Sequence, residues 1–149
     1  YTYLKEIFEA INNKQLNYNW LLTEVECYPA DEDLDEYFFY GNYFFMTGEE
    51  LTKMIEEDDF QWIWGIFSGF KKDKSLDEIL KYELPNFEDT GCFHNPVTIQ
   101  HPLADIEISV WDSSYTVIVS KDEKVLKDYK SYFKDSMDLE EYNNNRKRT

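Results

Sequence analysis

The chain has 149 residues, of which 42% are hydrophobic and 18% aromatic, and its 31 acidic and 15 basic residues give a formal net charge of −16. This length fits one domain, expected over residues 1–149, and so many aromatic residues exclude a disordered acidic tail. The charge repels nucleic acid and anionic membranes and attracts basic proteins, so we expect neither nucleic acid nor a membrane as a partner.

The first elements are predicted to be a helix, a strand and an acidic connection. Hydrophobic residues recur at helical spacing over Thr2–Asn12. Trp20–Tyr28 alternates like a strand that Pro29 ends. One face of this strand would carry Leu21, Thr23, Val25 and Cys27. Ala30–Glu36 is expected to be an acidic loop or a single helical turn.

An aromatic segment and a second helix follow. Tyr37–Met46 contains Gly41-Asn42, a pair that suits a two-residue hairpin turn, so the segment is predicted to be either two short strands or one. Thr47 and Glu50 have the spacing of a capping box, which predicts a helix that ends near Asp58.

Phe60–Phe70 is the least polar stretch, and its apolar residues on both faces predict a central strand covered on both sides. One of these faces would carry Trp62, Trp64, Ile66, Ser68 and Phe70. A second capping box at Ser75 and Glu78 predicts a short helix. Leu84–Pro102 is expected to be a long surface loop.

The last third is predicted to form a hairpin and a helix. The strands would be Ile106–Trp111 and Tyr115–Val119, and Ser120 with Glu123 would cap the final helix. Residues 143–149 are expected to be a frayed polar tail. Together these elements predict an α+β fold with a mixed or antiparallel sheet and helices packed mainly on one face, as a single pair of layers.

The acidic residues are concentrated in one window. Between Glu24 and Asp59 there are 13 acidic residues and one basic residue, Lys53, and aromatic residues are interleaved with them. Tight interfaces place rings at a desolvated centre with charges around them, so this window predicts a surface for a basic protein. The candidate residues are Asp31, Glu32, Asp33, Asp35, Glu36, Tyr40, Tyr43, Glu56, Glu57, Asp58 and Asp59. A purely solubilising role is the alternative.

Cys92, His94 and His101 are the only candidates for metal or thiol chemistry. Their spacing matches neither a zinc finger nor a helical zinc site, and no residue is identified that would orient a histidine base. Cys27 is interpreted as a small core residue, and a single bridge between Cys27 and Cys92 stays open. We therefore expect a protein that is not an enzyme and that uses no metal or cofactor. A small-molecule or peptide sensor with a pocket of Trp62, Trp64 and Trp111 is one alternative function. An enzyme that uses Cys92, His94 and His101 is a second alternative.

Three segments resemble known families. Tyr3-Leu4-Lys5-Glu6-Ile7 with Tyr18-Asn19-Trp20, and later Val110-Trp111-Asp112-Ser113-Ser114-Tyr115, resemble a small family of unknown function found in low-GC Gram-positive bacteria. Trp62–Gly69 is similar to a tryptophan-glycine segment of bacterial toxin-immunity proteins, which are often small acidic α+β domains. This resemblance implies an inhibitor of a cationic toxin domain.

The location is expected to be cytoplasmic, because no apolar run reaches 18 residues and no basic and apolar leader opens the sequence. The sequence starts at Tyr1 without a methionine, which is consistent with a short preceding segment.

Overall fold

Residues 2–88 and 91–147 are described by a computed structural model of the chain. Over these ranges the chain forms six α-helices, two 3-10 helices and five strands. In chain order the elements are α1 (Leu4–Ala10), η1 (Lys14–Asn17), β1 (Tyr18–Cys27), α2 (Glu32–Tyr40), β2 (Tyr43–Thr47), α3 (Gly48–Glu57), β3 (Trp62–Lys71), α4 (Leu76–Ile79), η2 (Gly91–Phe93), β4 (Ile106–Trp111), β5 (Tyr115–Ser120), α5 (Glu123–Tyr132) and α6 (Leu139–Arg146).

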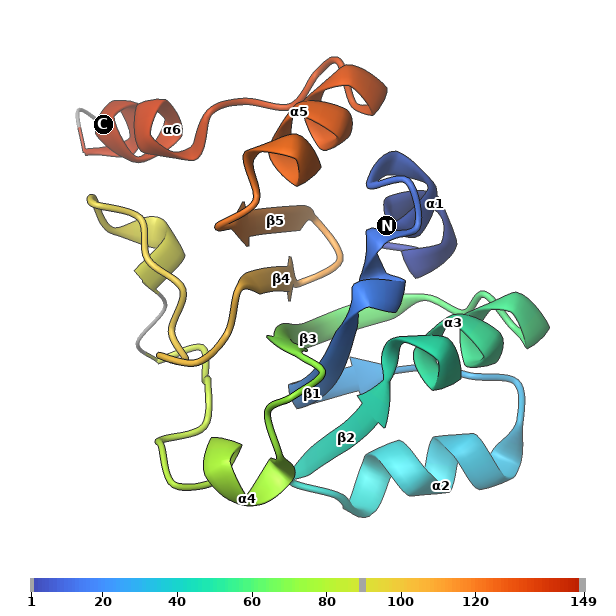
Figure 1. The fold of residues 1–149 in the computed structure, drawn as a ribbon. Coiled ribbons are helices and arrows are strands. Elements are labelled where there is room, and N and C mark those ends of the chain that lie inside the picture. The colour runs from blue at the N-terminus through green and yellow to red at the C-terminus, as the bar shows by residue number, and fades with distance from the viewer. Residues whose placement is uncertain (1, 89–90, 148–149) are drawn as a thin grey trace.

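The strands form one open sheet in the order β2-β1-β3-β4-β5, and every neighbouring pair is antiparallel (Figure 1). The predicted central strand is confirmed, because β3 lies in the middle of the sheet and contributes Phe67 to one core and Phe70 to the other. The predicted hairpin is confirmed as β4 and β5. The chain therefore has an α+β fold with an antiparallel sheet.

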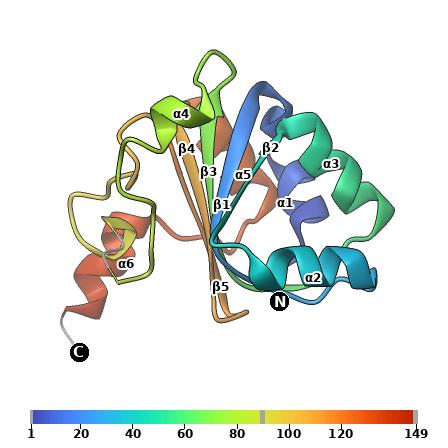
Figure 2. The ribbon, with the colours of Figure 1, turned by 90° about the horizontal axis from the view of Figure 1, so that it is seen from below.

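The helices lie mainly on one face of the sheet, as predicted. Figure 2 shows α1, α2, α3 and α5 on that side, where they enclose the larger core. The other face is covered by α4, the long segment between α4 and β4, and α6 (Figure 2). A smaller core of Leu21, Phe70, Ile79 and Ala104 lies there. Leucine, isoleucine and aromatic rings fill both cores, so burial of apolar surface is the main stabilising contribution.

The predicted faces of two strands are partly wrong. The β1–β3 register shifts between Thr23 and Cys27, where Glu24 adopts a φ of 54°. An extra residue in one strand reverses the alternation beyond it. Cys27 therefore lies in the larger core, whereas Leu21 lies in the smaller one. Opposite this irregularity Trp62 also lies in the larger core, away from Phe70.

The prediction for residues 30–46 is wrong in its first half. The structure places the helix α2 over Glu32–Tyr40 instead of an acidic turn followed by a strand. Only the strand β2, Tyr43–Thr47, remains of the predicted hairpin, and Gly41-Asn42 connects helix to strand. The aromatic composition favoured strands, but packing against the larger core overrides that propensity.

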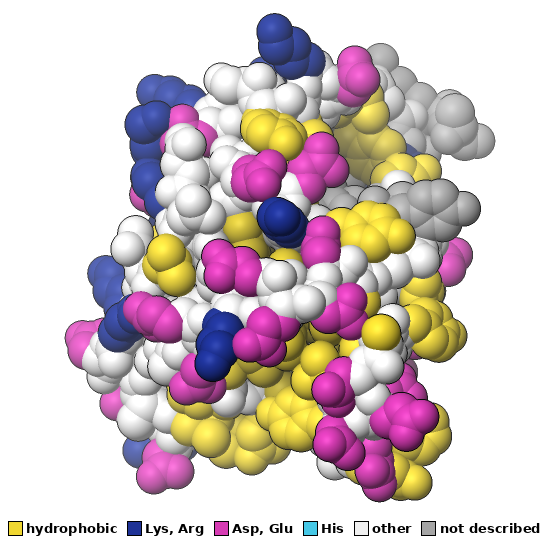
Figure 3. Space-filling view, turned by 90° about the vertical axis from the view of Figure 1, so that its right-hand side faces the viewer, with side chains coloured by type: hydrophobic (Ala, Val, Ile, Leu, Met, Phe, Trp, Pro, Cys, Tyr) yellow, Lys and Arg dark blue, Asp and Glu magenta, His cyan; other side chains and the backbone are white. Residues whose placement is uncertain are grey.

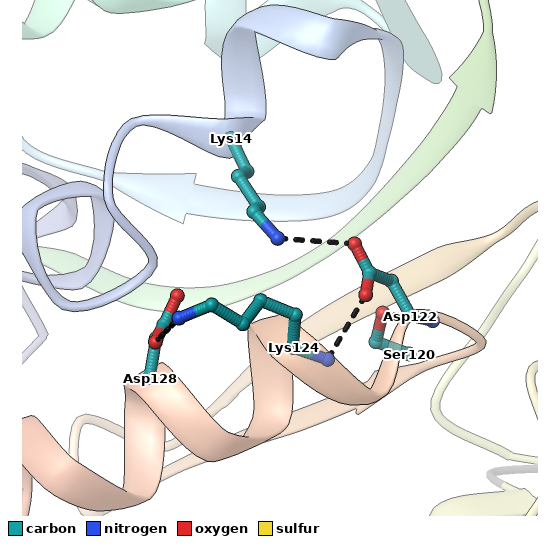
Figure 4. A network of polar contacts seen from close by, with 5 residues as sticks. All are labelled: Lys14, Ser120, Asp122, Lys124 and Asp128. Carbon is teal, nitrogen blue, oxygen red and sulfur yellow. Dashed lines mark hydrogen bonds and ion pairs between the residues drawn. The ribbon is translucent and has the colours of Figure 1, made fainter.

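The helix α5 begins two residues later than predicted. Asp122 is the N-cap, and its side chain accepts the Lys124 N–H at 2.9 Å. Ser120 instead accepts the Asp122 N–H at 3.0 Å. Lys14 of η1 pairs with the same Asp122 carboxylate at 3.2 Å, which ties α5 to the N-terminal half of the chain (Figure 4).

The predicted frayed tail over residues 143–149 is also wrong where the structure describes it. Residues 143–146 belong to α6, and residues 148–149 lie outside the described ranges. Asn143 is buried, and its side-chain amide donates to the Cys92 carbonyl at 2.9 Å and to Asn95 Oδ1 at 3.1 Å. These bonds hold a polar helix that has little apolar surface of its own. None of the helices in the described part of the chain is long and apolar enough to cross a membrane.

Candidate protein-binding surface

The acidic run 31–36 forms the first turn of α2. The Asp31 side chain caps the helix by accepting the Leu34 N–H at 2.9 Å. Glu32, Asp33 and Asp35 follow in the first turn. Carboxylates are stabilising at this end of a helix because its backbone N–H groups carry partial positive charge. This capping explains why an acidic sequence becomes helical here.

Phe38 attaches α2 to the larger core. Its ring is buried and lies edge-on to Phe44 and Trp62, with centroid separations of 4.9 and 5.5 Å. Leu34, one turn earlier, packs on the same core and is partly buried. Since only one side of α2 is held in this way, the rest of the helix surface faces solvent.

Large aromatic rings project from that outer surface. Phe39 and Tyr40 are 78% and 76% exposed, and their rings touch each other edge to face at 5.0 Å. Tyr28, Tyr37 and Tyr43 are also exposed. Single exposed rings are ordinary, but neighbouring exposed rings of this size mark interaction sites.

The second acidic run, 56–59, lies beside the first. Asp58 Oδ2 accepts the backbone N–H of Ala30 at 3.0 Å, which joins the end of α3 to the segment before α2. Asp59 Oδ1 accepts the backbone N–H of Lys5 at 3.3 Å. Burial raises the pKa of Asp59 above its usual value, and neighbouring Asp58 acts in the same direction. The bond from Ala30 to Asp58 thus places the end of α3 next to the start of the first acidic run.

The acidic–aromatic surface consists of these two acidic runs and the exposed rings around α2. Figure 3 shows carboxylates gathered beside hydrophobic side chains at the lower corner of the molecule, where Figure 1 places α2. The structure brings the predicted residues together on the α2, α3 and β2 side of the fold. Phe39 was missed as a separate candidate, and only its helical position next to buried Phe38 distinguishes it.

No carboxylate of either acidic run forms an ion pair in the described part of the chain. The ion pairs found over residues 2–88 and 91–147 use Glu49, Asp105, Asp122 and Asp128. Lys5 partly offsets the charge of Asp59. The other carboxylates of the two runs are free of ion pairs with basic side chains of the described residues. The surface holds rings for apolar contact in the same place.

The candidates for thiol chemistry do not form a common site. Cys92 is fully buried against α6, and His94 is exposed. His101 is 1% exposed, its Nε2–H donates to the Ile79 carbonyl at 2.9 Å, and its Nδ1 accepts the Leu103 N–H at 3.1 Å. Burial lowers the pKa of His101. The imidazole is thus a neutral structural group with both nitrogens occupied.

Neither cysteine forms a disulfide, and both thiols are buried. Burial raises the pKa of Cys27 to about 12, so this thiol stays protonated and unreactive at neutral pH. In the described residues no three His, Cys, Asp or Glu side chains converge to hold a metal ion.

The three tryptophans suggested for a pocket do not meet. Trp64 and Trp111 lie 5.1 Å apart, and Phe87 packs against both. Trp62 packs instead in the larger core against Phe67 at 4.9 Å. The space beside Trp64 and Trp111 is filled by rings of the long loop, so these side chains are a packed cluster rather than a pocket.

A family model described as "Protein of unknown function (DUF2691)" matches residues 1–148. No curated protein and no solved structure matches the chain.

Proposed function

Since the chain belongs to the DUF2691 family of proteins of unknown function, we propose from its geometry that it is a protein-binding domain whose acidic–aromatic surface binds a basic protein. The observation that carries this proposal is α2 itself, where carboxylates that form no ion pair in the described chain share one helix with exposed Phe39 and Tyr40.

The end of α3 supports the same proposal. Glu56 and Glu57 lie in the last turn of this helix, and that turn contains no basic residue. Carboxylates at a helix C-terminus are unfavourable, because the exposed carbonyl groups carry partial negative charge. A cationic partner would relieve both this repulsion and the repulsion between the two acidic runs, so part of the binding free energy comes from strain already present in the free protein.

The partner would be a toxin domain, and the chain would be its immunity-like inhibitor in a bacterial cytoplasm. The resemblance of Trp62–Gly69 to immunity proteins motivates this finer statement. Lysine and arginine side chains on the toxin would pair with the carboxylates, and Phe39 or Tyr40 would occupy an apolar pocket at the centre. Inhibition would follow from occlusion of the toxin's functional surface, and no catalytic step would be involved.

The test compares two variants of equal charge. One carries Asp33→Lys, Glu36→Lys, Glu56→Lys and Glu57→Lys on the acidic–aromatic surface. The control carries Asp73→Lys, Asp77→Lys, Glu83→Lys and Glu88→Lys, which are exposed carboxylates around α4 and the following loop. Each reversal adds two units of charge, so both variants have a formal net charge of −8 instead of −16.

We expect the native chain and the control variant, but not the surface variant, to capture the same basic protein from lysate of the source cells. Association of that protein with the native chain should slow by about tenfold or more as salt is raised, because steering acts on the association rate. Equal capture by both variants, or an association rate that does not change with salt concentration, would refute the proposal.

A growth assay tests the immunity statement separately. Expression of the captured partner alone should arrest growth, and co-expression of the native chain or the control variant should restore it. A harmless partner would remove the immunity role and leave protein binding in place.

A further inference from the structure

The strand β5 is an edge of the sheet and forms the floor of a groove. The strand order ends at β5, which Figure 1 shows at the outer end of the sheet, and Figure 2 shows α5 and α6 on opposite faces of the sheet. A groove of about 700 Å³ runs along residues 114–119. This volume is in the range of sites that hold a small molecule or a short peptide.

Alternate backbone groups of β5 point away from β4, and those of Thr116 and Ile118 lie along the groove. The Lys121 N–H donates to the Asp105 carbonyl at 2.9 Å, and the β4–β5 register continues from there. In an antiparallel pair alternate residues bond the partner strand, so Thr116, Ile118 and Ser120 direct their N–H and C=O groups away from β4. No hydrogen bond to these backbone groups is found in the described part of the chain.

The sequence of β5 does not protect this edge. Tyr115–Ser120 reads Tyr-Thr-Val-Ile-Val-Ser and contains no charged residue and no proline. Natural proteins normally place lysine, proline or a bulge on an exposed edge, because an unprotected strand of this composition pairs with other chains. An edge that is left open inside a groove is suited to receive one strand and to exclude larger surfaces.

Two helices supply apolar walls to the groove. On one side α5 contributes Leu126 and Tyr129, and on the other side α6 contributes Leu139 and Tyr142. Met137, in the connection between the two helices, is 70% exposed. A flexible methionine and amphipathic tyrosines can pack on different side chains, which suits a site that accepts a peptide.

The charge of the groove indicates the charge of the segment that binds there. The charged groups that line it are four carboxylates, from Glu6, Asp135, Asp138 and Glu140, and one ammonium group, from Lys130. A cationic segment is therefore favoured. A second copy of this chain is disfavoured, since pairing two β5 edges would bring two anionic grooves together.

We propose that this groove binds an extended segment of another protein, which adds to β5 as a sixth strand. The segment alternates apolar residues with others that include lysine or arginine, and it spans about five or six residues, or roughly 17–20 Å. Outward backbone groups of Thr116 and Ile118 bind its backbone, and the helical walls and carboxylates select its side chains. This site is distinct from the acidic–aromatic surface, because α2 and β2 lie at the opposite end of the sheet (Figure 1).

The first test selects random octapeptides displayed on phage against the full chain. We expect enriched peptides to alternate apolar residues with lysine or arginine. Their affinity should fall by about tenfold in the variant Asp135→Lys with Glu140→Lys, and it should be unchanged in Asp73→Lys with Asp77→Lys. Each pair reverses one loop carboxylate and one in the first turn of a helix, so charge and helix effects are matched. The proposal would be overturned if no peptide were enriched, or if the enriched peptides bound the variant Asp135→Lys with Glu140→Lys as tightly as the native chain.

The second test examines strand geometry with an enriched peptide. Backbone N-methylation at alternate residues of the peptide should abolish binding in one register and be tolerated in the other, since only one edge of the peptide faces β5. Binding should slow amide hydrogen exchange at Thr116 and Ile118. Equal effects of both methylation registers, or unchanged exchange at these two amides, would rule out strand addition. Peptide-independent dimers that bury β5 would identify a second copy as the occupant and would also overturn the proposal.

Discussion

Glu107 is the least expected residue in the fold. A carboxylate is rarely buried fully, but both faces of β4 are covered and the Glu107 side chain is 1% exposed. Oε2 accepts the Gln100 N–H at 2.9 Å, and Oε1 accepts the Ser109 hydroxyl at 3.4 Å. Gln100 in turn accepts the Asn86 N–H at 3.0 Å. This chain of bonds fixes the long loop, which carries Phe87 against Trp111, to the sheet.

Burial raises the pKa of Glu107, although the two hydrogen bonds act in the opposite direction. The folded state therefore holds this proton more tightly than the unfolded state does. Its contribution to stability is complete below the usual glutamate pKa of about 4.3 and is lost as the pH rises from there through the raised folded pKa.

Glu107→Gln should therefore change stability in a pH-dependent direction. Glutamine keeps an acceptor for the Gln100 N–H and stays neutral, so the free energy of unfolding of the variant, relative to the native chain, should increase between about pH 4 and about pH 8. Urea unfolding at the two pH values measures this difference. Exposed Glu88→Gln is the control and should show little change. A difference for Glu107→Gln that does not vary with pH would mean that the carboxyl is ionised at little cost.

At the scale of elements, the start of α3 shows how closely two backbones approach. Thr47 caps the helix by accepting the Glu50 N–H at 3.0 Å, as its sequence pattern predicts. Gly48 then lies directly against η1: a Cβ there would be 2.2 Å from the Gln15 carbonyl oxygen and 2.8 Å from the Tyr18 carbonyl oxygen. No side chain can move to relieve such a contact.

Gly48→Ala should destabilise the protein by about 1–3 kcal/mol, because the added methyl forces α3 and η1 apart. Lys53→Ala, on the exposed side of the same helix, should change stability by less than about 0.5 kcal/mol. Chemical denaturation of both variants tests the contact. If the two variants had equal stability, α3 and η1 would have to separate without cost.

Local sequence signals predicted where helices and strands occur better than they predicted what each element packs against. Capping residues located α3 and α4, and hydrophobic period located α1, β3 and the β4–β5 hairpin. α2 was missed because Tyr37–Tyr40 has strand-like composition, and its helical state depends on the Asp31 cap together with packing of Phe38 on Trp62. The cap is local, but the contact of Phe38 with Trp62 joins residues far apart in the sequence, which a local pattern does not contain.

The same limit applies to the two surfaces. The acidic runs are visible in the sequence, but their adjacency depends on the bond from Ala30 to Asp58. The groove had no sequence signal as a site, because its floor and walls come from β5, α5 and α6. The uncharged sequence of β5 is a usable clue only when the strand order shows that it is an edge.

At the scale of the whole molecule, the two proposed surfaces lie at opposite ends of one rigid sheet. α2 and β2 border one end, and β5 borders the other (Figure 1). Both are proposed to bind cationic partners, so one basic protein could contact α2 with a folded surface while another inserts an extended segment at β5. Occupation of one site should leave the affinity of the other nearly unchanged, apart from partial neutralisation of the shared negative charge.

Net charge gives a prediction for the free protein. At a formal charge of −16, repulsion among the acidic groups opposes compaction, and the ion pairs found in the described chain lie on the surface, where they contribute little. Raising NaCl from about 0.01 M to about 0.1 M shortens the Debye length from about 30 Å to about 10 Å. We expect the midpoint of thermal unfolding to rise by about 2–4 °C, equivalent to about 1 kcal/mol for a chain of this size.

The two variants of charge −8 show where this repulsion originates. If the carboxylates around α2 and the end of α3 repel one another most, the surface variant should gain less stability from salt than the control variant of equal charge. An equal gain in both would assign the repulsion to net charge alone. A midpoint that falls with salt would show that attractive ion pairs dominate, and it would remove the argument that a cationic partner relieves strain stored in the acidic–aromatic surface.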